Sequence, residues 1–141
     1  MADAQSTRLI ALRGATTVDA DARGDIKQRT EELLTQLLQR NALAVDDIVS
    51  ILFTATPDLR SDFPAAAARA IGLAHTPLLC AQEIPVEGAM ERCVRVLIHC
   101  YAPAEAARHH VYLHEAQELR LDLPSSRAGA AQPGADQGRA T

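Results

Sequence analysis

Short apolar runs recur along the chain and predict four strands. Segments that carry Gly, Pro and Asp separate these runs, which is the usual punctuation between strands and helices. The predicted strands cover residues 8–13, 48–53, 78–82 and 92–101. Such spacing leaves room for a helix after each of the first two strands.

The fourth run has the two-residue period of a half-buried strand. Its apolar face carries Val94, Val96 and Ile98. Arg95 therefore lies on the other face, together with Leu97 and His99. An arginine side chain does not readily lose its proton, so on the middle of a sheet it needs an anion nearby. That anion is either a protein carboxylate or a ligand.

A helical stripe follows the first strand. Apolar residues recur there at i, i+7, i+8, i+11 and i+12, namely Ile26, Leu33, Leu34, Leu37 and Leu38. This pattern predicts an amphipathic helix over residues 23–41. Asp19 or Asp21 is the expected N-terminal cap.

A second, shorter helix is predicted over residues 65–71. Asp62 offers a cap, Pro64 fits the first turn, and Gly72 is placed to end the helix. After the fourth strand, Pro103 is expected to start a helical turn through residue 108. A last short strand is expected near residues 118–121.

The predicted order is β-α-β-α-β-β with extra C-terminal structure. It indicates an α+β fold, in which helices cover one side of a mixed sheet. Residues 1–124 are expected to form one domain. Residues 125–141, rich in Ala, Gly, Ser and Gln, are expected to form a flexible tail. So small a sheet leaves edges and one face open, which favours a symmetric oligomer.

Composition narrows the function classes. The chain has 141 residues, 48% of them hydrophobic and 3% aromatic, so aliphatic residues must build the core. A net charge of −4 provides no basic field for nucleic acid. No apolar run approaches the ~20 residues needed to span a bilayer, and the run at residues 9–12 is too short for a signal peptide. We expect no membrane contact and a cytoplasmic location.

Charged residues also end two other apolar runs. Arg13 follows the apolar run at residues 9–12, and Glu83 follows the run at residues 78–82. Strand-borne charges of both signs indicate a polar pocket in an apolar scaffold, although a purely structural Arg–Glu pair would give the same pattern.

Metal and phosphate chemistry are weakly indicated. The five histidines are scattered, and only His110 and His114 have i,i+4 spacing, without a third ligand in evident register. The segment after Arg13 lacks the glycines and the Lys-Ser/Thr ending of a P-loop. We therefore expect no metal and no cofactor.

Cysteine chemistry is a further alternative. Cys80, Cys93 and Cys100 are odd in number and lack CxxC spacing, so we expect reduced thiols. Cys80 precedes Glu83 by three residues and could lie near Arg95 as a nucleophile. A buried cysteine is more commonly a small apolar filler.

Several motifs, taken together, resemble the monofunctional AroH-type chorismate mutase family. The resemblance covers residues 8–123 and consists of Arg13-Gly14-Ala15-Thr16-Thr17, Thr54-Ala55-Thr56-Pro57-Asp58-Leu59, Phe63-Pro64-Ala65, Cys80-Ala81-Gln82-Glu83, Arg92-Cys93-Val94-Arg95-Val96 and His110-Val111-Tyr112-Leu113. It implies a homotrimer with a barrel-like β core, helices outside, and active sites at the subunit interfaces. It also implies the Claisen rearrangement of chorismate to prephenate, without cofactor or metal.

The resemblance also implies roles for individual residues. The catalytic group would be Arg13, Glu83, Arg95 and Tyr112, in which the arginines and the tyrosine bind the enolpyruvyl carboxylate and Arg95 also contacts the ether oxygen. Glu83 and Cys80 would lie near the ring hydroxyl. Phe63 and Arg69 would form the pocket wall and mouth. The family often has a lysine where this chain has Ala66, so one cation at the mouth is absent.

Two other functions remain open at this level. A trimeric module could bind small anions through the same arginines without accelerating any reaction. A hydrolase or isomerase could instead act through Cys80. Loss of chorismate in an assay separates the first of these from a mutase.

Overall fold

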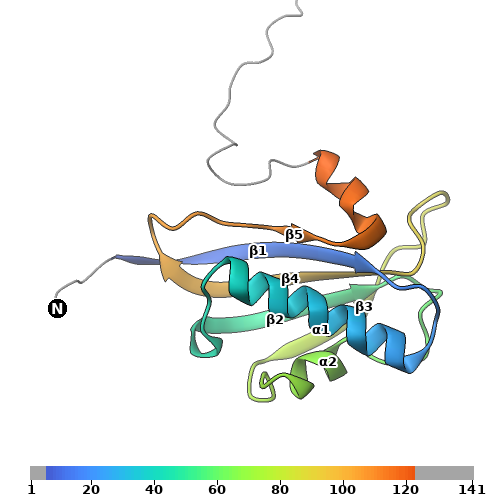
Figure 1. Cartoon of the computed structure of the whole chain (residues 1–141), viewed down its shortest axis with the longest axis horizontal. Helices are drawn as coiled ribbons and strands as arrows, with labels where there is room; N and C mark the ends of the chain where they lie inside the picture. The colour runs from blue at the N-terminus through green and yellow to red at the C-terminus, as the bar shows by residue number, and fades with distance from the viewer. Residues whose placement is uncertain (1–5, 123–141) are drawn as a thin grey trace, which may run out of the picture.

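The structure is a computed structural model that describes residues 6–122 (Figure 1). Its elements are β1 (Thr7–Thr17), α1 (Arg23–Arg40), η1 (Val45–Asp47), β2 (Ile48–Ala55), α2 (Ala65–Ala70), β3 (Leu78–Gln82), β4 (Cys93–Pro103), β5 (Val111–Tyr112) and η2 (His114–Asp122), where η marks a 3-10 helix. The four predicted strands and both predicted helices are present. The predicted tail, residues 125–141, lies outside the described residues.

Five strands form one mixed sheet in the order β3-β2-β4-β1-β5. The long strand β4 is antiparallel to both β1 and β2, whereas β3 and β5 add parallel pairs at the two edges. Figure 1 shows α1 crossing one face of this sheet. The α+β class with a mixed sheet is therefore confirmed.

The helix-covered face holds the main core. Strand residues of the predicted alternating pattern pack there against α1, namely Ile10, Leu12, Ile51, Phe53, Val96 and Ile98. Their partners Leu33, Leu34 and Leu37 are fully buried, as the helical stripe predicts. Each such leucine contributes about 1.5–3 kcal/mol by leaving water. Gly14 permits this close approach, because a Cβ there would lie 2.9 Å from the Leu37 Cδ1 atom.

Within residues 6–122, no helix covers the centre of the opposite face of the sheet. Leu9, Leu79 and Tyr101 are half to two-thirds exposed there, with relative exposures of 52%, 61% and 50%. At one end η2 covers Ala15 and Cys93. This open face carries Arg95, as the two-residue period predicts.

Two predictions after β4 are wrong. Residues 103–108 do not form a helical turn that begins at Pro103, because β4 continues to Pro103 in register with Thr7 of β1. Residues 118–121 belong to η2 and not to a strand. The fifth strand is instead the two-residue β5, which pairs with Gly14 and Ala15. Pairing with β1 thus determines both where β4 ends and where β5 lies.

The predicted N-terminal caps of the two helices are also wrong. The N-cap position of α1 is Ala22, without a side-chain hydrogen bond. Asp21 Oδ1 instead accepts the backbone N–H groups of Arg60 and Ser61, at 2.9 Å each, and so fixes a distant loop. Asp62 Oδ1 accepts the Phe63 N–H, and Pro64 itself occupies the N-cap of α2. Gly72, with φ of +100°, follows α2 as predicted.

Candidate active site

A cavity of about 660 Å³ opens on the uncovered face of the sheet. Four of the predicted site residues line it, namely Arg13, Glu83, Arg95 and Tyr112. The strand register brings them together. Arg95 lies opposite Ala15 of β1 and Thr54 of β2, while Tyr112 also pairs with Ala15. Residues that are nearly 100 positions apart in the chain thereby share one hollow.

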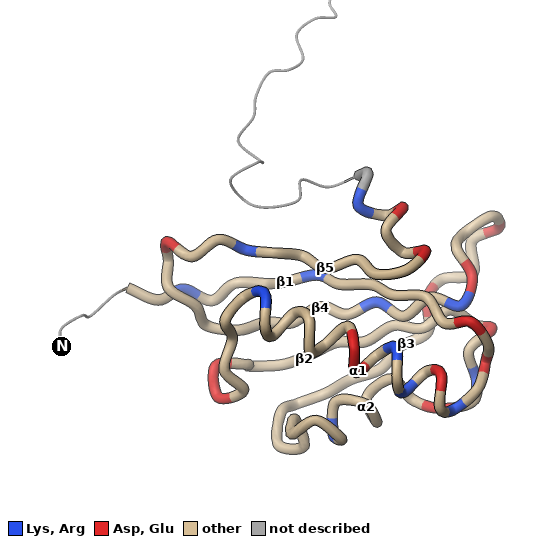
Figure 2. The backbone as a smooth tube through the Cα atoms, viewed as in Figure 1, with Lys and Arg blue, Asp and Glu red and all other residues tan. Residues whose placement is uncertain are grey.

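Charge is distributed unevenly between strands and connections. The charged residues of the described strands are all arginines, namely Arg8, Arg13 and Arg95. Figure 2 shows that the acidic positions lie in the helices and the connecting segments. Arg13 and Arg95 line the cavity together with one acidic residue, Glu83, so its wall carries a net positive charge. Such a surface suits an anionic ligand.

Arg95 meets a carboxylate of its own chain at the cavity wall. Its Nε atom lies 3.2 Å from Glu83 Oε2, and Thr54 Oγ1 donates to the same oxygen. The Nε–H group has no hydrogen bond of suitable geometry, so the contact with Glu83 is an ion pair. The Arg95 side chain remains 42% exposed. A protein carboxylate, one of the two alternatives left open by the sequence, thus lies beside Arg95, and Arg95 still lines the cavity.

Tyr112 is held more tightly than the charged residues. Tyr112 packs with Ala15, Cys93 and Ala116, and the residue is only 9% exposed. Burial raises the pKa of the Tyr112 hydroxyl, and the nearby Arg13 and Arg95 only partly oppose this. The hydroxyl therefore keeps its proton near neutral pH and can donate a hydrogen bond to an anion.

Sequence reasoning missed several residues that line the cavity, namely Leu52, Thr54, Leu97 and Leu119. Thr54 occurs in one of the recognised motifs, and its place opposite Arg95 would have identified it had the pairing of β2 and β4 been known. Leu119 belongs to η2, where a strand was expected. That Leu119 lines the cavity could therefore not be predicted from the sequence.

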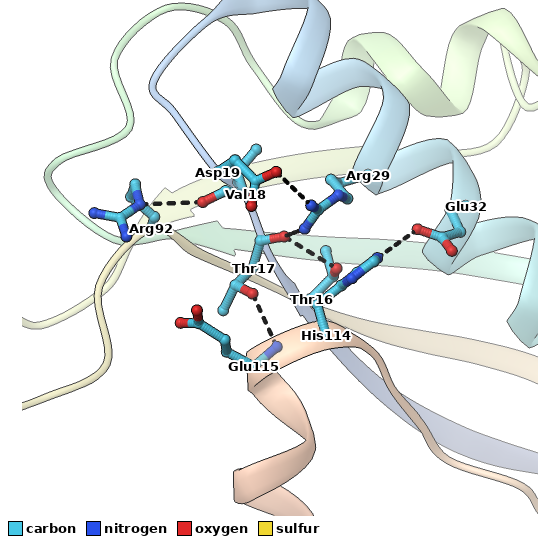
Figure 3. Close-up of polar contacts among 9 residues, drawn as sticks. All are labelled: Thr16, Thr17, Val18, Asp19, Arg29, Glu32, Arg92, His114 and Glu115. Atoms are coloured by element: carbon cyan, nitrogen blue, oxygen red, sulfur yellow. Dashed lines mark hydrogen bonds and ion pairs between the residues drawn. The ribbon is translucent and has the colours of Figure 1, made fainter.

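A network of polar contacts fixes η2 beside the end of β1 (Figure 3). Thr17 Oγ1 accepts the Glu115 backbone N–H at 3.1 Å, and His114 Nε2 lies 2.9 Å from Glu32 Oε1 of α1. Arg29 donates to the Thr17 carbonyl and pairs with Asp19 at 3.0 Å. These contacts hold the helix that supplies Leu119 to the cavity.

Three further predicted site residues do not line this cavity. Phe63 and Cys80 line a separate hollow of about 430 Å³, together with Arg23 and Arg60. Cys80 pairs with Phe53 and packs against the helix-covered core, so the expectation that it lies near Arg95 is wrong within one chain. Arg69 is exposed on α2 and lines neither hollow.

The cysteines and histidines form no reactive cluster in the described residues. All three cysteines are free, as expected. Burial raises the pKa of Cys93 to about 11, against the opposing effect of Arg95, and burial also raises the pKa of Cys100. Within residues 6–122, no group of three or more potential metal ligands is present. No helix in that range is long and apolar enough to cross a membrane.

The fold and the cavity define an α+β protein whose sheet face forms a cavity with a net positive charge. Comparison with known proteins gives the family. The family described as chorismate mutase type I matches residues 9–123. This chain therefore belongs to the type I chorismate mutase family.

Individual relatives agree with that assignment. The chain is 45% identical over 118 residues to the chorismate mutase AroH of Thermus thermophilus, covering 82% of this chain and 96% of that protein. It is 40% identical over 115 residues to the chorismate mutase AroH of Bacillus subtilis, covering 79% and 90%. A solved chorismate mutase from Clostridium thermocellum has 42% identity and a TM-score of 0.73, covering 77% of this chain and 98% of that one.

Proposed function

We infer that this protein catalyses the rearrangement of chorismate to prephenate, a step of aromatic amino acid biosynthesis. Chorismate is a dianion, and its conversion breaks a C–O bond and forms a C–C bond within one molecule. The reaction needs no proton transfer and no covalent intermediate. The observation that carries the inference is Arg95, a strand-borne cation that reaches into the cavity beside Glu83.

The first task of the enzyme is to hold the enolpyruvyl side chain over the ring. Arg13, Arg95 and Tyr112 line one cavity and can clamp a single carboxylate. A guanidinium binds a carboxylate through two parallel hydrogen bonds, which fixes angle as well as distance. Such positioning removes part of the entropic barrier before the bonds begin to change.

The second task is to stabilise charge that develops only in the transition state. As the ether bond lengthens, its oxygen becomes more negative. We propose that Arg95 faces this oxygen, so that its attraction is stronger in the transition state than in the ground state. Millionfold acceleration requires about 8 kcal/mol in total. Clamping of the carboxylate and one strong electrostatic contact at the ether oxygen together supply a free energy of that order.

Glu83 has a complementary role in this proposal. Its carboxylate balances Arg95 in the empty site and accepts a hydrogen bond from the ring hydroxyl of chorismate. Thr54 Oγ1 already donates to one of its oxygens, which fixes the orientation of the carboxylate. Glu83 acts as an acceptor and not as a general base, because the reaction moves no proton.

We further propose that the complete site forms between subunits of a homotrimer. Phe63 and Cys80 lie in a different hollow from Arg95, so a site that contains all three draws on two chains. Leu9, Leu79 and Tyr101 leave an apolar surface on the open face that such packing would cover. Arg23 and Arg60 line the hollow of Phe63 and can supply the positive charge that Ala66 does not.

The trimer gives a direct prediction. Light scattering on the purified protein is expected to give a mass of about 45 kDa, three times the 15.1 kDa of one chain. Replacing Tyr101 with Asp places a charge on the apolar face, so it should lower this mass and the activity together. A fully active monomer would contradict the shared site.

The reaction itself is tested by following chorismate. Purified protein is expected to convert chorismate to prephenate at an undiminished rate in EDTA, because neither task requires a metal. Absorbance of chorismate gives the rate, and the spontaneous reaction in buffer is the control. Binding of chorismate without any loss of absorbance would instead indicate a non-catalytic anion-binding module.

A cysteine mechanism receives less support. The residues that line the hollow of Cys80 include no histidine that could act as its base. We therefore assign Cys80 a lining role in the proposed site. The three free thiols are in keeping with a reducing compartment, and we infer a cytoplasmic location.

A further inference from the structure

The backbone of Arg13 is bonded to a side chain at a point where a sheet normally supplies a carbonyl group. Arg13 donates its backbone N–H to His110 Nδ1 at 3.0 Å. With Gly14 paired to Val111, a regular parallel ladder would give this N–H to the carbonyl of His109. The imidazole ring of His110 thus replaces a ladder acceptor at the start of β5.

The carbonyl of His109 is engaged elsewhere. Asn41, at the end of α1, donates to it through Nδ2 at 2.9 Å and accepts the His109 N–H through Oδ1 at 2.8 Å. These two bonds direct both backbone polar groups of His109 toward the end of α1. The His110 ring is consequently the acceptor available to the Arg13 N–H among the described residues.

Only a neutral ring can accept this bond. Nδ1 must offer its lone pair, so the ring proton lies on Nε2, and protonation at Nδ1 would remove the acceptor. Burial lowers the pKa of His110, and the charges of Arg13 on β1 and of Arg108 and His109 beside the ring lower it further. The surroundings therefore favour the form that the hydrogen bond requires.

We propose that His110 is a positioning residue that holds Arg13 and Tyr112 in their common cavity only while its imidazole ring is neutral. Arg13 lies on one side of the bond, and Tyr112 lies two residues beyond His110 on β5. Losing the bond loosens β5 against β1 at the point where both side chains enter the cavity. This role rests on the proposed function, since it concerns the residues that bind the substrate.

The sign of the pH dependence follows from the lowered pKa. Above the ordinary histidine pKa of 6.5 the ring is neutral in both folded and unfolded chains. As the pH falls below this value the unfolded chain takes up the proton first, so stability declines. Activity declines at still lower pH, when the folded chain is protonated and the Arg13 bond is lost.

Asparagine and glutamine provide matched variants. The Asn Oδ1 atom occupies nearly the place of Nδ1, whereas the Gln Oε1 atom corresponds to Nε2 and is misplaced for the Arg13 N–H. We expect H110Q to lower kcat/KM about three- to tenfold, the range for one lost hydrogen bond. H110N should retain kcat/KM within about twofold and should lack the wild-type decline in acid that His110 causes.

The experiment combines two measurements on the full chain. Chorismate turnover is followed between about pH 5 and pH 8 for the three proteins, and 15N NMR of the wild-type protein reports which ring nitrogen of His110 carries the proton. An Nε2–H ring at neutral pH, together with the expected difference between the variants, supports the proposal. An Nδ1–H ring, or equal profiles for H110N, H110Q and wild type, overturns it.

Failure of the proposed function would look different. If wild-type protein does not convert chorismate at any pH, the mutase assignment fails, while NMR still decides whether the His110 bond exists. If H110Q does not fold, the comparison of wild type with H110N decides the role. If activity then declines at low pH in H110N as it does in the wild type, the proposed role of His110 is overturned.

Discussion

Replacing Arg95 with alanine is expected to lower kcat/KM for chorismate by about 10³-fold or more. Removing one donor to a developing oxyanion typically costs about 10²–10³ in rate, or about 3–4 kcal/mol. Arg95 is a full cation in a partly enclosed cavity, where screening by water is reduced, so its loss should reach or exceed the upper end of that range. Steady-state kinetics of the purified variant measure the effect.

The physical reason for the loss also predicts how it is divided between kcat and KM. An interaction made mainly in the transition state lowers kcat and kcat/KM together, with a smaller change in KM. Arg95→Lys is the matched control, because it retains the charge and loses the planar fork. It should recover part of the rate. Near-normal turnover of Arg95→Ala in a properly folded oligomer would show that Arg95 does not have the proposed role.

Replacing Arg13 with alanine is expected to give the second largest loss, about 10²-fold in kcat/KM. Arg13 lines the same cavity, and within the described residues its guanidinium forms no salt bridge like that of Arg95 with Glu83. It is therefore free to bind the substrate carboxylate with both of its parallel N–H groups. Its removal should weaken ground-state binding as well as positioning.

The division of this loss between KM and kcat distinguishes Arg13 from Arg95. For Arg13→Ala we expect KM to rise about tenfold and kcat to fall by a similar factor, because the carboxylate is gripped before and during the reaction. Arg13→Lys should recover binding better than turnover. An unchanged KM in Arg13→Ala would mean that this side chain does not hold the substrate.

Local patterns were sufficient for four of the five strands and for the two faces of β4. Val94, Val96 and Ile98 are buried as their alternation predicted; the leucines of α1 share a core with Val96 and Ile98, and Ile26 of α1 shares one with Val94. The position of Arg95 on the opposite face followed from the same period. These features depend on the spacing of neighbouring residues, which a sequence displays directly.

Long-range pairing decided what local patterns could not. Pro103 has the local character of a helix start, yet its register with Thr7 extends β4. Asp21 has the character of a helix cap, yet its carboxylate binds the backbone of Arg60 and Ser61. In both cases a partner distant in the sequence outweighs a local preference.

The candidate site was predicted in part for the same reason. Arg13, Glu83, Arg95 and Tyr112 share a cavity, in keeping with the family resemblance. Thr54 was missed because its place beside Glu83 depends on the pairing of three strands. The separation of Cys80 from Arg95 was missed because adjacent motifs in the sequence say nothing about opposite faces of a sheet.

The central claim is that a fixed positive charge at position 95 stabilises the ether oxygen as it gains negative charge. Installing citrulline at that position tests it most directly, since a urea group preserves the shape of the guanidinium and removes its charge. We expect kcat to fall by about 10³-fold or more, with the fold and the oligomer intact. Prephenate formation at the wild-type rate would contradict the claim.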